Sequence, residues 1–144
     1  MAGRADSFRL RRVDTGTVLV DVLHVASTIW SRFCGLQLRR PLPPGHGMLL
    51  VPCRSIHTMF VRFAIDVLFL SEEGVVNEVR RDVRPWRVVV PRHPVHAVLE
   101  MAAGSVDVET GTAVSVESPD GTVPASLTFL KDERVIRDPE ERPC

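Results

Sequence analysis

The segment Gly47–Leu70, GMLLVPCRSIHTMFVRFAIDVLFL, decides the fold because it joins the densest apolar sequence in the chain to a group of reactive side chains. Met48–Val51 and Ile65–Leu70 are predicted to be strands, and Ser55–Phe60 is predicted to be extended because β-branched and aromatic residues favour that conformation. The reactive side chains are those of Cys53, His57, Arg62 and Asp66. We therefore expect the fold and any functional site to centre on this segment.

The composition favours a β-rich fold of one domain. A chain of 144 residues can bury a core without a metal or a disulfide. Valine dominates the apolar residues and tyrosine is absent, and valine fits a pleated sheet better than a helix. We predict a mainly β (α+β) fold: a compact mixed β-sheet or barrel-like domain of about eight short strands with one or two short helices.

Hairpins are predicted on both sides of the central segment. Phe8–Val13 and Thr17–Val25 flank the turn composition of Asp14-Thr15-Gly16, and Val75–Val83 alternates apolar and charged residues as a partner for Ile65–Leu70. A two-turn helix is predicted from Ser27 or Thr28 to Gly35, followed by a proline-rich loop over residues 39–47. Further strands are predicted at Val88–Val90, Val95–Met101, Thr112–Glu117 and, more weakly, Ala125–Leu130.

The chain is interpreted as one core with two flanking segments. Residues 1–26 form an N-terminal hairpin packed on the same domain, residues 27–117 form the core, and residues 118–144 form a partly flexible extension. From Lys131 onward, charge and proline predict a solvated tail.

The charge, apolar runs and cysteine content indicate which partners and which cellular compartment to expect. The formal net charge is zero, so no global basic field supports binding to nucleic acid, which we consider an improbable partner. No apolar run is long enough for a secretory signal or a bilayer span, so we expect a cytoplasmic protein without a membrane partner. Three widely spaced cysteines predict reduced thiols rather than a disulfide framework.

Asp66 is the main candidate because it interrupts an otherwise apolar strand. Alternation puts its side chain on the face of Leu68 and Leu70, so the carboxylate is either at the solvated edge of the strand or buried, where it needs a partner. The structural interpretation is an Asp that accepts backbone N–H groups or pairs with Arg62. The functional interpretation is a ligand-binding group or a general base.

Metal and cofactor sites are not predicted. Cys53 and His57 are four residues apart, which on a strand separates them by about 13 Å, too far for direct pairing. His93 and His96 are separated by a proline and lack an accompanying cysteine pair, so they do not form a zinc motif. The arginines of residues 80–92 surround Trp86 and could form a patch that binds anions or nucleic acid, but a solvated strand face interleaved with Glu78 and Asp82 is the better account of them.

Several spaced motifs together carry a family resemblance. Ser31-Arg32-Phe33-Cys34-Gly35-Leu36, residues 55–70, Arg84-Pro85-Trp86 and residues 98–104 resemble the domain of unknown function 192 family, also called uncharacterised protein family 0127. The resemblance covers roughly residues 27–117 and implies a compact β-rich domain with no established activity. Two departures from the family pattern are Ala64, where proline is usual, and Thr110-Gly111-Thr112, where a Gly-Asp pair is usual.

Two functions are compared. The first is a non-catalytic module that binds a small ligand or a protein partner in a groove beside Asp66. The second is a hydrolase or transferase in which Asp66 is the base and His57 or Arg62 stabilises developing charge. The matching polar residues, and therefore the candidate site, are Arg32, His57, Arg62, Asp66, Trp86 and Glu100.

Overall fold

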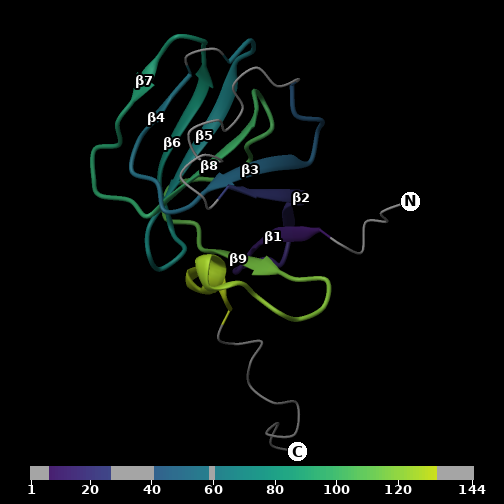
Figure 1. The fold of residues 1–144 in the computed structure, drawn as a ribbon. Helices are drawn as coiled ribbons and strands as arrows, with labels where there is room; N and C mark the ends of the chain where they lie inside the picture. Colours follow the sequence, from purple (N-terminus) through teal and green to yellow (C-terminus); the bar gives the residue numbers. More distant parts are fainter. Residues whose placement is uncertain (1–6, 27–40, 59–60, 133–144) are drawn as a thin grey trace, which may run out of the picture.

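The computed structural model describes residues 7–26, 41–58 and 61–132, and these are almost entirely strands and turns (Figure 1). The prediction of a mainly β fold is confirmed. The elements are β1 (Phe8–Arg12), β2 (Val18–Ala26), β3 (His46–Leu50), β4 (Ile56–His57), β5 (Ile65–Leu70), β6 (Val76–Val83), β7 (Val88–Val89), β8 (Ala97–Ala102), β9 (Val114–Glu117) and the 3₁₀ helix η2 (Ala125–Leu130).

Seven strands form one curled sheet in the order β6-β5-β8-β3-β2-β1-β9. All neighbours are antiparallel except β2 and β3. The two ends of the sheet meet, because the Val76 N–H donates to the Thr112 carbonyl at 2.8 Å and the Val114 N–H donates to the Gly74 carbonyl at 2.9 Å. These bonds bring the start of β6 against the start of β9, which gives the sheet its barrel-like curvature (Figure 1).

The curled sheet separates two apolar clusters. The inner cluster receives residues from all seven strands, including Leu10, Val20, Leu49, Leu68 and Leu99. The outer cluster covers the opposite face of β3, β8 and β5, with Met48, Val67, Phe69 and Val98 among its members. Because a fully buried Leu, Val or Phe side chain stabilises a fold by about 1.5–3 kcal/mol, both faces contribute to stability.

A short two-stranded ribbon of β4 and β7 packs on the outer cluster. Ile56 pairs with Val89 and His57 pairs with Val88. Ile56 is buried in the outer cluster and Val89 packs against it. The ribbon is therefore a second layer on one face of the main sheet, as Figure 1 shows for β4 and β7.

The predicted hairpins are present. Gly16 has φ +72° in the turn between β1 and β2, a conformation that glycine adopts without a steric penalty. β5 pairs with β6 as expected from the alternation in Val75–Val83. The predicted loop over residues 39–47 is too long, since β3 already begins at His46.

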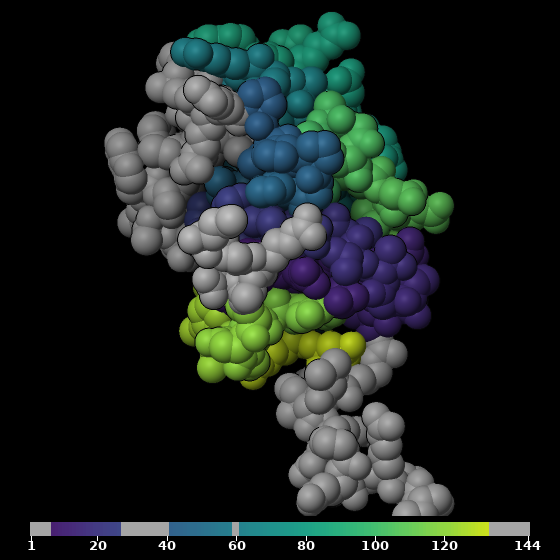
Figure 2. All heavy atoms as spheres, turned by 90° about the vertical axis from the view of Figure 1, so that its right-hand side faces the viewer, coloured from purple at the N-terminus to yellow at the C-terminus, as the bar shows by residue number. Residues whose placement is uncertain are grey.

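Ala125–Leu130 is a 3₁₀ helix, so the predicted weak strand is wrong. Leu127 and Leu130 are spaced by three residues, which matches the 3₁₀ period and lets both enter the inner cluster. A short apolar run does not distinguish a strand from a helix by periodicity alone. Figure 2 shows this C-terminal segment in yellow beneath the N-terminal strands in purple.

The helix predicted from Ser27 or Thr28 lies outside the described residues. Within residues 7–26, 41–58 and 61–132, no helix is long and apolar enough to cross a membrane.

Candidate functional site

Asp66 binds two backbone segments, one in β6 and one that follows β8. Its Oδ1 accepts a hydrogen bond from the Asp82 N–H at 2.9 Å, and its Oδ2 accepts from the N–H groups of Gly104 at 2.9 Å and Val106 at 3.4 Å. The residue is 1% exposed. Both carboxylate oxygens are thus used by backbone donors, which agrees with the structural interpretation of this residue.

The Asp66 carboxylate also supports an irregular backbone. Asp82 has φ +52° at a register shift where β6 pairs with β5 between Ile65 and Val67. A non-glycine residue with positive φ is uncommon and persists where surrounding contacts hold it. Asp66 supplies such a contact at the bulge.

The structure does not join Arg62 to Asp66. Arg62 is exposed, and among the described residues no ion pair links the two side chains. The alternative in which Asp66 pairs with Arg62 is therefore not found. Backbone N–H groups, and not the Arg62 guanidinium, bind the carboxylate.

His57 and Asp66 belong to opposite sides of the main sheet. Leu68 and Leu70, which share the face of Asp66, are in the inner cluster. His57 is in β4, whose neighbouring Ile56 packs on the outer cluster. A catalytic pair of His57 and Asp66 is therefore wrong, because alternation along β5 directs the carboxylate away from the ribbon.

Glu100 lies on the outer face, in the middle of the sheet. It pairs directly with Met48 of β3 and Val67 of β5, both of which are buried apolar residues. Its Oε2 is buried and accepts no hydrogen bond from the part of the chain that the structure describes. Burial raises the pKa of Glu100 to about 8, so the side chain is a neutral carboxylic acid at pH 7.

Two histidines lie on the same face as Glu100, beyond Met48. His24 pairs in register with Met48, and the His24 Nε2 is 3.2 Å from the His46 Nδ1. The rings are stacked, with centroids 5.5 Å apart. Sequence reasoning missed this pair because the residues are 22 positions apart and meet only through the parallel pairing of β2 and β3.

Thr58 holds the turn that carries Trp86. The Thr58 Oγ1 donates to the Arg84 carbonyl at 2.7 Å and accepts from the Arg87 N–H at 2.8 Å. The Trp86 N–H donates to the Thr58 carbonyl at 3.0 Å. Thr58 is fully buried, so this turn is fixed from inside the protein. Sequence reasoning missed Thr58 because a threonine in an extended run has no distinctive signal.

Trp86 projects into solvent from a strained backbone. Its φ is +64° and it is 60% exposed. Val88 and Val90 follow at alternate positions and are 64% and 63% exposed. We call Trp86, Val88 and Val90 the ribbon surface. It consists of the large apolar side chains that are exposed among the described residues.

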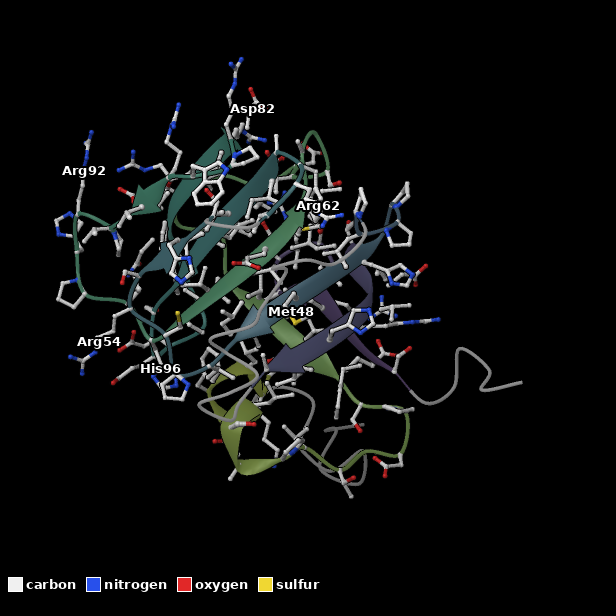
Figure 3. The ribbon with its side chains drawn as sticks, turned by 45° about the horizontal axis from the view of Figure 1, so that its top comes forward. Met48, Arg54, Arg62, Asp82, Arg92 and His96 are labelled. Carbon is white, nitrogen blue, oxygen red and sulfur yellow. The ribbon has the colours of Figure 1, made fainter. Side chains whose placement is uncertain are left out.

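An open groove of about 770 Å³ begins where the ribbon surface ends. Val90 belongs to both features. Its lining includes the basic side chains of Arg54, Arg92 and His93 and the acidic side chains of Glu72 and Glu73 from the β5–β6 turn. Figure 3 shows Arg54 and Arg92 projecting from the same side of the molecule.

The predicted site residues do not converge on one cavity. Asp66 is inside the curl, Glu100 is on the outer face, Arg62 is exposed, and Trp86 shares the ribbon segment with His57. Arg32 lies outside the described residues. In the parts of the chain that the structure describes, no cluster of three or more His, Cys, Asp or Glu side chains could hold a metal ion.

The comparisons with known proteins agree with this architecture. The profile of the domain of unknown function 192 (DUF192) family, described as an uncharacterised ACR, matches residues 11–116. This chain belongs to the DUF192 family. A UPF0127 protein of Pyrococcus furiosus is 34% identical over 98 residues, which is 66% of this chain and 79% of the relative. A UPF0127 protein of Thermococcus sibiricus is 30% identical over 125 residues, which is 80% of each chain.

Two crystal structures share the DUF192 fold of this chain. One, from Sinorhizobium meliloti and provisionally named a transcription regulator, has a TM-score of 0.66 and 25% identity, over 76% of this chain and 91% of that one. The other, a protein of unknown function from Novosphingobium aromaticivorans, has a TM-score of 0.65 and 19% identity, over 75% of this chain and 82% of that one. The family and the fold are thus established, and neither carries an assigned activity.

Proposed function

We propose that this DUF192 protein is a non-catalytic binding domain that contacts a protein partner through the ribbon surface of Trp86, Val88 and Val90. The conformation of Trp86 is the observation that carries the proposal. A bulky residue at φ +64° costs on the order of 1–3 kcal/mol, and this one is 60% exposed, so little burial offsets the strain.

The surroundings of Trp86 support the same conclusion. The buried hydroxyl of Thr58 fixes the turn through backbone groups of Arg84 and Arg87, so the backbone that carries the indole is held in place. Exposed tryptophans on rigid supports are typical binding hot spots, since a preorganised side chain loses little entropy on association.

Asp66 is a poor candidate for the binding group. Its oxygens are occupied by backbone donors and the side chain is 1% exposed. A ligand could reach the carboxylate only after those hydrogen bonds broke. The groove of Arg54, Glu72 and Val90 does not include Asp66 and lies beside the ribbon.

The test is to pan a random peptide library displayed on phage against the full chain and against Trp86→Ala. We expect sequences enriched on the wild type to be lost on the variant. A Trp side chain at a hot spot contributes 2 kcal/mol or more, so the affinity should fall by about 30-fold or more. Equal retention by both proteins would refute the proposal.

A second candidate function is catalysis with Glu100 as a general acid. The observation in its favour is a buried carboxylic acid with an unpartnered oxygen, since catalytic acids that work near neutral pH have raised pKa values. Chromogenic esters, phosphoesters and glycosides provide a general test. Turnover by the wild type that Glu100→Gln abolishes would favour catalysis over binding alone.

A further inference from the structure

We infer that the occupant of the ribbon surface is an extended, acidic segment of a partner protein that continues into the adjoining groove. The inference rests on the proposed function and adds the chemistry of the partner. It is carried by the continuity of the apolar surface with the groove and by the charges around both.

The apolar surface and the groove form one path. Trp86, Val88 and Val90 occupy alternate positions, and Val90 also lines the groove. A strand rises about 3.3 Å per residue, so an extended segment could contact successive members of this path with alternate side chains. In a helical segment the side chains on one face recur every 3.6 residues, which does not match the two-residue spacing of Trp86, Val88 and Val90.

The backbone of β7 is oriented for pairing with such a segment. The Thr58 N–H donates to the Arg87 carbonyl, so the polar backbone groups of Arg87 face β4. By strand alternation those of Val88 face the other edge of the ribbon, where an added strand could bind. Pro91 ends this edge after Val90, so the pairing is short and the side chains supply most of the affinity.

Arginines surround the path and favour an acidic occupant. Arg87 and Arg92 flank the exposed valines, and the Arg92 side chain is 82% exposed, with a 4.0 Å contact to Glu78. Arg54 also lines the groove. Guanidinium groups bind carboxylates through paired hydrogen bonds. Because these arginines lie beside exposed valines, the path favours a segment that carries both acidic and apolar side chains.

The same charges argue against other occupants. A second copy of this chain would bring Arg54 and Arg92 to the contact together with Glu72 and Glu73, whereas an acidic segment of a partner brings carboxylates to the arginines. A nucleic acid backbone would place phosphates near Glu72 and Glu73, which also line the groove. A peptide, unlike a nucleic acid, can carry negative charge at some positions and apolar side chains at others, so its carboxylates can lie beside the arginines and away from Glu72 and Glu73.

The panning experiment on the full chain also tests this inference. We expect the enriched peptides to carry more Asp and Glu than the unselected library, interspersed with apolar residues. For a synthetic peptide of the most enriched sequence, the double variant Arg54→Glu/Arg92→Glu should weaken binding by about tenfold or more, because like charges would face each other. Lys131→Glu, a charge reversal at an exposed position outside the groove, is the matched control and should bind normally.

The outcomes separate the inference from the proposed function. Peptides that require Trp86 but contain no excess of Asp and Glu would contradict the inference of an acidic segment and would leave the proposed binding function intact. Peptides that ignore Trp86, or the absence of any enriched sequence, would overturn both. The inference that the partner is a protein would be contradicted if no peptide bound and if duplex DNA, single-stranded DNA or phosphatidylglycerol vesicles bound in a Trp86-dependent way.

Discussion

At the scale of single residues, two buried carboxyl groups have opposite relations to their surroundings. Asp66 is stabilised by hydrogen bonds from three backbone N–H groups. Glu100 has an apolar environment in which its charged form is disfavoured. The first group stabilises the fold as a charged acceptor, and the second destabilises the fold once it ionises.

Asp66→Asn should destabilise the protein by about 3 kcal/mol, because the amide cannot offer two charged acceptors to the N–H groups of Asp82 and Gly104. Urea denaturation measures the loss. Arg62→Ala, at an exposed position, is the control and should change the free energy of unfolding by less than about 0.5 kcal/mol. Wild-type stability in Asp66→Asn would contradict the structural role.

Glu100 should make the protein less stable as pH rises. In the folded protein its pKa of about 8 lies above the ordinary value of 4.5, so the contribution of the bound proton to stability is complete below pH 4.5 and is lost as pH rises through 8. The free energy of unfolding should therefore fall by up to about 1.4 kcal/mol per pH unit within that window. Urea denaturation at pH 5, 6.5 and 8 measures the slope.

Glu100→Met is the matched variant, since methionine has a similar length and no ionisable group. Its stability relative to the wild type should increase steadily from pH 5 to pH 8. Parallel pH profiles of the two proteins would show that Glu100 titrates normally in the folded state.

At the scale of elements, the ribbon combines a firmly held turn with an exposed apolar face. Glycine adopts positive φ without steric strain, whereas alanine keeps the penalty of a Cβ atom. Trp86→Gly should therefore be more stable than Trp86→Ala by about 1 kcal/mol, as measured by thermal or urea unfolding of the two variants. Equal stability would mean that the turn relaxes and stores no strain.

At the scale of the whole molecule, the 3₁₀ helix η2 contributes side chains to the inner cluster. Leu127 of η2 is fully buried there, although it lies beyond the segment that the family profile matches. Leu127→Ala should cost about 2–5 kcal/mol by leaving a cavity. Thr128→Ala, at an exposed position of the same helix, should cost much less, and comparable losses would mean that η2 does not pack on the core.

The sequence by itself determined the fold class, the hairpins and the central strand, because strand alternation and turn composition are local signals. It also identified Asp66, which interrupts an apolar strand, and, through the family resemblance, Glu100 and Trp86. Only the tertiary structure decided their roles. The face of β5 on which Asp66 lies, the apolar neighbours of Glu100 and the support of Trp86 by Thr58 all depend on pairings between distant segments. Residue spacing along the chain does not specify such pairings, because they follow from how the sheet curls and which strands become neighbours.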